Sequence, residues 1–215
     1  MFIGHHAVGL GSKPFAPRTS LGALILAPML LDVLWPIFVL LGIESFRIDP
    51  GNTAVTPLDF AHYPWSHSLL MSIVWGVVAG AGYFAATRYG RGAAVIGIAV
   101  VSHWVFDYVT HRPDLPLYPG GPKVGLGLWN SVAGTVVVEA ILFAAGIYLY
   151  LRVTRATDRI GSIGFWSLIA VLLFIYVGNI TGPPPPNAAI VPVLVLAALL
   201  FPLWAWWVDR HRAIR

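Results

Sequence analysis

Three residues whose side chains can bind a metal ion recur at intervals of four near the middle of the chain: His103, Asp107 and His111. They interrupt an otherwise apolar run, residues 99–111. On an α-helix a step of four residues rotates by only about 40°, so we expect the three side chains to line one face. Ionisable groups within a membrane are costly and are usually retained where they pair, bind an ion or take part in chemistry. This run is therefore the first place to seek function.

Further ionisable residues lie in neighbouring apolar stretches, and their depths can be compared by counting along each stretch. An α-helix rises about 1.5 Å per residue, so we count from the nearest basic residue on the cytoplasmic side. His67 and His111 come out at about 30 Å, near the outer mouth, with His67 on the first turn of its helix. Four other groups, on three expected helices, share a depth of about 18 to 24 Å: Asp32, His103, Asp107 and Glu139. These four groups could meet inside a bundle.

The composition indicates that these helices lie in a membrane. Of the 215 residues, 58% are hydrophobic and only 10% are charged, and the mean hydropathy is +0.78. These values and the long apolar stretches exclude an ordinary soluble domain. The length suits one membrane-embedded helical domain, residues 1–215, rather than two domains. We interpret the net charge of +4 as a signal of membrane topology, and no nucleic-acid partner is expected.

Six stretches approach the ~20 residues that an apolar helix needs to cross a bilayer: 20–43, 66–86, 92–111, 131–151, 163–180 and 189–208. The predicted fold class is all-α, a polytopic membrane protein with about six transmembrane helices. We expect residues 1–150 to form the metal-site core. Residues 160–210 contain two helices without ionisable residues in their interiors, and we expect these helices to act as scaffold.

Lys and Arg residues divide unevenly between the two sets of connections. Three fall on one side, Arg47, Arg112 and Lys123, and the others fall on the opposite side: Lys13, Arg18, Arg88, Arg91, Arg152, Arg155, Arg159, Arg210, Arg212 and Arg215. The positive-inside rule then predicts that both termini are cytoplasmic and that a site near the loops 44–65 and 112–130 faces the outer leaflet. The first apolar stretch is too short and too weakly flanked for a cleavable signal, so we expect an uncleaved, multi-pass inner-membrane protein.

The amino-terminal segment before Lys13 is apolar but too short to span a bilayer. About eleven residues cover at most ~17 Å as a helix. Segments that do not span persist at membrane depth where they pack against protein. We therefore expect a short half-helix that folds back and brings His5 or His6 toward Asp107 and Asp32. The alternative is an amphipathic or disordered start, with both histidines exposed at the interface.

These groups together predict a metal centre. The chain has no cysteine, so any metal must be bound by nitrogen and oxygen. Zinc fits neutral imidazoles balanced by carboxylates better than calcium or magnesium, and one to three Zn²⁺ ions are expected. The expected ligands are Asp32, His67, His103 and Asp107, with His111, Glu139 and His5 or His6 available for further ions. Asp107 is best placed to bridge and is a candidate catalytic residue. Glu139 alone could equally form a structural hydrogen bond or ion pair.

The motifs also carry a resemblance to known proteins. Asp32 in the first span, His62-Tyr-Pro-Trp-Ser-His67-Ser and Ser102-His103-x-x-x-Asp107 resemble the bacterial inner-membrane family of membrane-bound metal-dependent hydrolases. That family shows an early His, an Asp-containing first span, a His-Arg-Gly-x-x-His-Ser element and a His-x-x-x-Asp helix. More distantly, the order of ligands is similar to the zinc-dependent phospholipase C and single-strand nuclease superfamily, whose helical core binds three zinc ions.

The resemblance covers roughly the first 140 residues and implies a distribution of ligands. It implies one metal on Asp32, His67, His103 and Asp107, a second on His5 or His6 with Asp107, and a third on His111 with Glu139. The chain departs from the family pattern in two places. Tyr63-Pro64 replaces Arg-Gly, and Thr135 replaces the histidine that the pattern places four residues before Glu139.

The outer loops supply candidates for acid–base chemistry and substrate binding. His62 precedes the helix of His67 and could act as a general acid and base at the mouth of the site, or simply contact water or a turn. Arg112 and Lys123 could hold a phosphate group, although loop cations are most often only solvated. The glycine-rich loop 118–127 is not a P-loop, because the Gly-Lys-Ser/Thr ending is missing.

The function that these observations favour is hydrolysis of an ester by metal-activated water. A site reached from the lipid headgroup level favours an amphipathic or lipid substrate, and the resemblance favours a phosphoester. Membrane lipid is the expected partner. Two alternatives remain open: a metal-ion or proton transporter that uses the same His and Asp cluster, and a catalytically inactive membrane scaffold.

Overall fold

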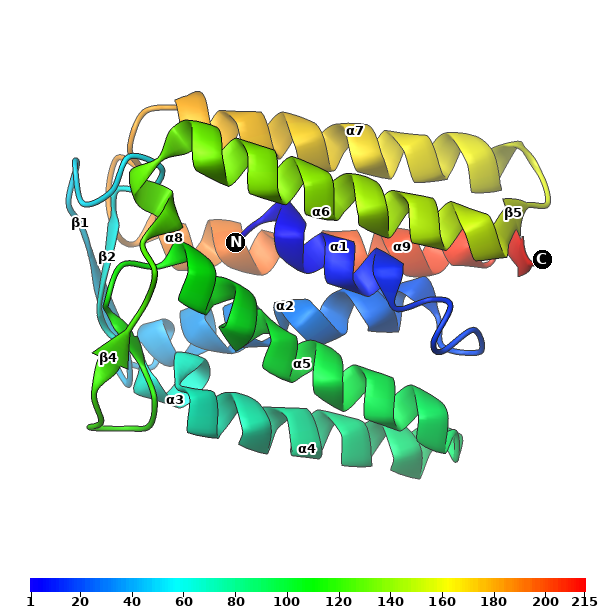
Figure 1. The fold of residues 1–215 in the computed structure, drawn as a ribbon, viewed down its shortest axis with the longest axis horizontal. Coiled ribbons are helices and arrows are strands. Elements are labelled where there is room, and N and C mark those ends of the chain that lie inside the picture. The colour runs from blue at the N-terminus through cyan, green and yellow to red at the C-terminus, as the bar shows by residue number, and fades with distance from the viewer.

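The computed structural model describes residues 1–215 as an elongated bundle of helices (Figure 1). In the middle of the bundle lie α2, the short α1 and the pair α8 and α9, flanked by α6 and α7 on one side and α4 and α5 on the other. The helix bounds are α1 (Ile3–Gly11), α2 (Leu21–Leu40), α3 (Pro64–His67), α4 (Leu69–Thr87), α5 (Gly90–Thr110), the 3-10 helix η1 (Leu128–Asn130), α6 (Val132–Val153), α7 (Arg159–Thr181), α8 (Ile190–Ala197) and α9 (Leu200–Asp209). The all-α prediction is confirmed.

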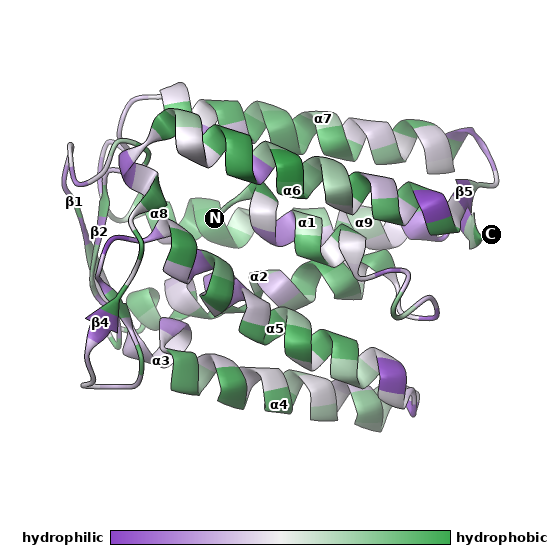
Figure 2. Cartoon of the chain, in the orientation of Figure 1, coloured by the Kyte–Doolittle hydropathy of each residue, from purple (hydrophilic) through white to green (hydrophobic).

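Six helical stretches are long and apolar enough to cross a membrane, as predicted: α2, α4, α5, α6, α7 and the α8–α9 pair. Hydrophobic residues predominate along these helices, whereas hydrophilic residues gather toward the two ends (Figure 2). The last span, expected as one helix over 189–208, is interrupted between α8 and α9. Pro202 in the first turn of α9 has no backbone N–H, so the helical hydrogen bond to Ala198 cannot form and the two helices join at that point.

Three small two-stranded sheets close the ends of the bundle. The hairpin of β1 (Ser45–Ile48) and β2 (Leu58–His62) and the pair β3 (Leu115–Pro116) and β4 (Lys123–Val124) lie at one end, and β5 (Thr154–Ala156) pairs with β6 (Arg212–Ile214) at the other. All three pairings are antiparallel. The loop-rich end with β1 to β4 is called the hairpin end below.

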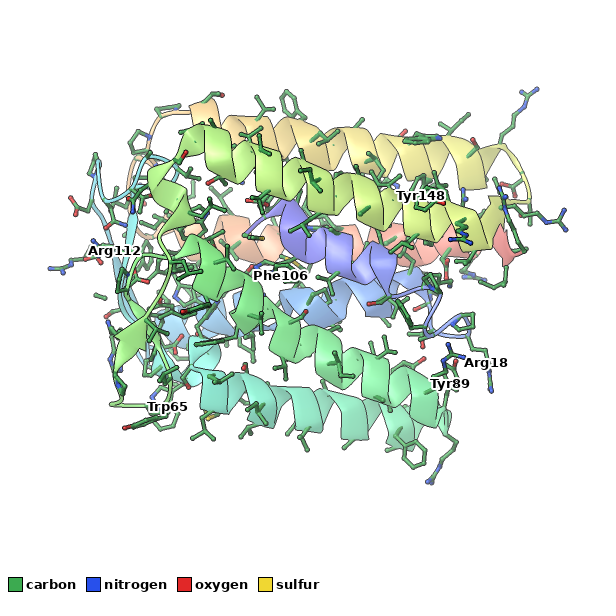
Figure 3. The ribbon with its side chains drawn as sticks, viewed as in Figure 1. Arg18, Trp65, Tyr89, Phe106, Arg112 and Tyr148 are labelled. Carbon is green, nitrogen blue, oxygen red and sulfur yellow. The ribbon has the colours of Figure 1, made fainter.

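The two groups of basic residues lie at opposite ends of the bundle. Arg112 lies among the loops of the hairpin end, and Arg18 lies at the other end, stacked on the ring of Tyr89 at 4.7 Å (Figure 3). Near Arg18, the guanidinium of Arg91 donates to the carbonyl of Pro14 at 3.4 Å. The arrangement agrees with the uneven division of Lys and Arg along the sequence.

Helix α1 lies inside the bundle between α2 and α6 (Figure 1). Its apolar side chains are buried, with Ile3 1% and Leu10 0% exposed. Two glycines permit this close packing: a Cβ at Gly146 would lie 2.5 Å from the carbonyl oxygen of Ala7, and one at Gly9 would lie 2.7 Å from Cα of Ile25. The half-helix expected from the short apolar segment is therefore built into the core.

The largest cluster of buried apolar residues joins α1 to the carboxyl-terminal helices. It brings Leu10 of α1 together with Tyr150 of α6, Phe165 and Leu172 of α7 and Val208 of α9. These side chains are at most 7% exposed and exclude water from the flank of α1. Helices α7 and α9 thus help to fix the position of α1.

Candidate metal centre

Helix α5 carries the central ligands, His103 and Asp107, and it ends at Thr110. His103 and Asp107 lie one turn apart on its buried face, and Asp107 Oδ2 is 3.0 Å from His103 Nε2. His111 was expected on the same helix, but it lies just after it, with extended backbone at φ −65° and ψ 146°. Pro113 follows two residues later: it has no N–H to donate to the carbonyl of Val109 and it disfavours helical geometry at Arg112, so the helix cannot continue through this segment. His111 still turns back, with Nε2 3.8 Å from Asp107 Oδ2.

Two other elements bring further ligands to α5. Asp32 of α2 places Oδ1 3.5 Å from His67 Nε2 and 3.8 Å from His103 Nε2. His67 Nε2 also lies 3.9 Å from Asp107 Oδ2. His67 ends the separate turn α3, because the extended Ser68 breaks the chain before α4 begins. The straight-helix count placed His67 about 30 Å deep because it assumed one continuous upright helix.

The ligand atoms form two overlapping triplets that share His103. Asp32, His67 and His103 make one triplet, and His5, His103 and Asp107 make the other, with the ligand atoms of each within 4.8 Å of one another. Asp107 faces both sides: Oδ2 lies toward His67 and His103, and Oδ1 lies 3.1 Å from His5 Nε2. The α-amino group of residue 1 also lies 2.7 Å from Asp107 Oδ1. Asp107 therefore has the geometry of a bridging carboxylate.

The centre is enclosed on most sides. The side chains of His5, His67, His103 and Asp107 are at most 6% exposed, whereas that of Asp32 is 29% exposed. Asp32 belongs to the inward face of α2, since Met29 and Trp35, one turn to either side, are 6% and 3% exposed. Asp32 is therefore the ligand through which the centre comes nearest to the surface of the bundle.

Each of the three histidines around Asp107 Oδ2 is held through its other ring nitrogen. His103 Nδ1 lies 2.6 Å from the carbonyl oxygen of Pro28, His67 Nδ1 lies 2.7 Å from Ser66 Oγ, and His111 Nδ1 lies 3.0 Å from Asp114 Oδ1. A proton on Nδ1 leaves the lone pair of Nε2 free to bind a metal, and such partners fix the tautomer and the orientation of the ring. All three Nε2 atoms lie within 3.9 Å of Asp107 Oδ2.

Asp114 is itself secured by neighbours at the hairpin end. Burial would raise the pKa of its carboxyl group, but hydrogen bonds from His111, Tyr63 and Arg112 outweigh that effect and lower the pKa below its ordinary value. Tyr63 donates from its hydroxyl at 3.0 Å and Arg112 donates from Nε at 3.1 Å. The carboxylate therefore stays charged and can hold His111 at neutral pH.

The donor set fits a zinc ion. Tetrahedral zinc with bonds of about 2.0 to 2.1 Å places its ligand atoms about 3.4 Å apart. Four of the six pairs among Asp32, His67, His103 and Asp107, each a histidine with a carboxylate, lie 3.0 to 3.9 Å apart. His103 Nε2 is fully buried and makes no well-formed hydrogen bond, although Asp107 Oδ2 lies 3.0 Å away. A buried polar atom without a partner is costly, and a metal ion would supply the missing partner.

Two of the predicted ligands lie beside the centre rather than in it. His6 is buried, but its Nδ1 lies 3.0 Å from the carbonyl oxygen of Phe2 and its ring packs against Phe201. The placement favours His5 over His6 as the ligand from α1, because residues adjacent on a helix face different directions. Glu139 accepts the backbone N–H groups of Phe2 and Gly4 at 3.0 and 2.9 Å. It caps α1, whose first N–H groups lack partners within the helix.

The predicted acid–base and substrate residues of the outer loops are not brought together with the ligands. His62 ends β2 with its side chain exposed, and no hydrogen bond joins it to the cluster. Arg112 is paired with two carboxylates, at 2.5 Å from Asp59 and 3.1 Å from Asp114, so its charge is already matched. Lys123 donates to the carbonyl of Ala61 at 3.3 Å on the surface.

Three residues that hold the histidines were missed by the sequence analysis: Glu44, Ser66 and Asp114. Asp114 follows His111 by three residues, a spacing that could have indicated the contact. Ser66 precedes His67 directly and could have been weighed as its partner. Glu44 left no local signal, because it acts across 22 residues of sequence.

Comparisons with known proteins found no relative of this chain. No family model, curated protein or solved structure matches the chain. The fold and the centre therefore define the class: a polytopic α-helical membrane protein with a buried cluster of His and Asp residues between its helices.

Proposed function

We propose that the protein is a membrane-embedded, metal-dependent hydrolase that binds zinc at Asp32, His67, His103 and Asp107. The convergence of their ligand atoms from three separate elements carries the proposal: both histidines, His67 and His103, lie within 3.9 Å of both carboxylates, Asp32 and Asp107. Ionisable groups are rarely grouped at membrane depth without a function. His5 and the bridging position of Asp107 support a second ion.

A bound zinc ion would lower the pKa of water toward 7 and polarise the ester oxygen, so no protein nucleophile is needed. The chain's own residues provide the rest. Pro28 and Ser66 hold Nδ1 of His103 and His67, so that their Nε2 atoms can bind the ion, and Asp114 holds the neighbouring His111 in the same way. The enclosed walls around His103 limit the entry of bulk water, and the partial exposure of Asp32 marks the side from which a substrate group can enter.

The proposed substrate is an amphipathic or lipid ester, with a phosphoester favoured by the resemblance to membrane-bound hydrolases and to the phospholipase C superfamily. The depth of the metal centre in the bundle supports an amphipathic substrate. His103 is seven residues from the end of α5 at Thr110, about 10 Å, and thirteen from its start, about 20 Å, so the centre lies toward the hairpin end. Apolar walls at that depth suit a substrate with a hydrocarbon chain.

The uneven division of basic residues supports an orientation in an inner membrane. With Arg18 and Arg91 cytoplasmic, the carboxyl terminus lies on the cytoplasmic side and the hairpin end faces outward. The amino-terminal residue was expected on the cytoplasmic side as well, but α1 runs from that side into the bundle and places the α-amino group at the centre (Figure 1). The proposed site then opens toward the outer leaflet. The carboxyl-terminal half of α1, with the fully buried Leu10, packs between α2 and α6 on the cytoplasmic side of the centre (Figure 1), which favours an enzyme over a transporter with a through pathway.

The test uses purified full-length protein with a chromogenic probe, a long-chain alkyl p-nitrophenyl phosphodiester in mixed micelles. We expect release of p-nitrophenolate that is lost on chelation, restored by zinc and absent in His103→Ala. Asp209→Asn is the matched control, because it alters a carboxylate at the opposite end of the bundle, where Asp209 pairs with Lys13 at 2.8 Å. Zinc uptake into proteoliposomes without turnover of this probe or of a carboxylic-ester analogue would overturn the hydrolase in favour of a transporter.

A further inference from the structure

Glu44 is one of the few buried acidic residues outside the cluster of ligands. It lies directly before β1 and is only 3% exposed. Its Oε1 accepts the backbone N–H groups of Trp65 and Ser66, both at 2.8 Å, and thereby caps α3. Its Oε2 accepts the hydroxyl of Ser66 at 2.6 Å. Both carboxylate oxygens are therefore engaged by the segment that leads into His67.

The direction of the hydrogen bonds follows from this arrangement. A carboxylate can only accept, so the single proton of the Ser66 hydroxyl points at Glu44. Ser66 Oγ then accepts from His67 Nδ1, which lies 2.7 Å away. With the proton on Nδ1, His67 Nε2 presents a lone pair toward Asp32 Oδ1 and Asp107 Oδ2. The chain of contacts thus sets the tautomer that a metal ligand needs.

We propose that Glu44 and Ser66 are positioning residues that hold His67 in its metal-binding tautomer. The inference rests on the proposed metal centre and deepens it by naming residues outside the ligand set. It also links the β1–β2 hairpin to the metal, because Glu44 begins that hairpin. Partners of this kind typically change metal affinity by about 10–100-fold when they are replaced.

Replacing Glu44 by Gln separates positioning from simple support of the fold. The amide oxygen of the new side chain takes over the two backbone N–H groups, because turning the amide around would set N–H against N–H. Its nitrogen then donates to Ser66 Oγ. The Ser66 proton must turn to His67 Nδ1 or to the carbonyl of Tyr63, which is 3.5 Å away and poorly placed to accept it. Donation to Nδ1 places the histidine proton on Nε2 and blocks the ligand atom.

Ser66→Ala acts differently, since it removes the hydroxyl without reversing the hydrogen bonds. His67 can then still adopt the binding tautomer, although nothing enforces it. We therefore expect Glu44→Gln to weaken metal binding more than Ser66→Ala does. A role limited to helix capping predicts the reverse, because the glutamine preserves the cap while the alanine removes a buried hydrogen bond.

The experiment measures Zn²⁺ and Co²⁺ affinity of the full chain in detergent by competition with a chromogenic chelator, together with thermal unfolding of the metal-free forms. We expect Glu44→Gln to lose about 10–100-fold in affinity and Ser66→Ala to lose a smaller factor, of at least about threefold. Asp209→Asn, the control carboxylate-to-amide change, should keep wild-type affinity. The absorption spectrum of bound Co²⁺ should change in Glu44→Gln, because its nitrogen ligands change.

The outcomes separate this inference from the proposed function. Wild-type affinity in a folded Glu44→Gln variant, or a larger loss in Ser66→Ala, overturns the positioning role while the metal centre stands. If Glu44→Gln does not fold, wild-type affinity in Ser66→Ala overturns it in the same way. A wild-type protein that binds neither metal overturns both proposals together.

Discussion

Asp107→Asn is the change that bears most heavily on the proposed centre. An asparagine has almost the same size but offers one oxygen instead of two and carries no charge. In the structure Asp107 Oδ2 lies 3.0 Å from His103 Nε2 and Oδ1 lies 3.1 Å from His5 Nε2. Asparagine cannot bridge these two sides, so we expect zinc affinity to fall by at least about 100-fold, the upper end of the range for changes behind the ligands.

The expected size of the effect can be measured as zinc-dependent stabilisation. A ligand that binds only the folded state at 100 times its Kd stabilises it by about 2.7 kcal/mol. At the same zinc concentration, a variant with 100-fold weaker binding gains only about 0.4 kcal/mol. Thermal unfolding in detergent, with and without zinc, should therefore show a clear rise in Tm for the wild type and almost none for Asp107→Asn.

Asp209→Asn controls for the loss of a buried carboxylate as such. Asp209 accepts from Lys13 at 2.8 Å and from Tyr150 at 3.0 Å at the end of the bundle opposite the hairpins. This variant should have a lower Tm without metal, because breaking a buried pair is destabilising, yet retain the full zinc-dependent rise. A full zinc-dependent rise in Asp107→Asn would refute the bridging role of Asp107.

Three further predictions concern topology, the amino-terminal helix and pH. A reporter active only outside the cytoplasm should work when inserted in the loop 112–130 and fail at the carboxyl terminus, and the opposite pattern would reverse the orientation. Deleting residues 1–12 should remove one metal equivalent and most turnover while the other helices still insert, because His5 is lost; unchanged metal content would contradict this. Because the pKa of Asp114 is lowered below its ordinary value of 3.8, its hydrogen bonds stabilise the fold above that pH and are lost as the pH falls further. In thermal unfolding scans between pH 5 and 3, the Tm of Asp114→Asn should therefore fall less steeply than that of the wild type.

The sequence was sufficient to predict the bundle, because a membrane leaves few choices. Apolar stretches of about 20 residues form spanning helices, and the structure has all six. The separation of four residues between His103 and Asp107 likewise identified the buried face of α5. Period and length are local properties, and a single sequence displays them directly.

Contacts made across the bundle were harder to predict. A depth count along straight helices placed His67 and Asp32 about 9 Å apart in height, whereas the break at Ser68 brings their ligand atoms to 3.5 Å. Glu139 was open between a metal ligand and a structural partner, and the structure places its Oε2 on the backbone of α1. Side-chain direction depends on breaks and helix ends, which the hydrophobic pattern does not encode.

Elemental analysis of the purified protein is the most direct test of the metal centre. His103 belongs to both triplets of ligand atoms, so its replacement should empty the whole site. We expect at least one mole of zinc per mole of wild-type chain and close to none in His103→Ala, with both proteins folded. A wild-type protein without bound metal, or a His103→Ala variant that keeps its zinc, would contradict it.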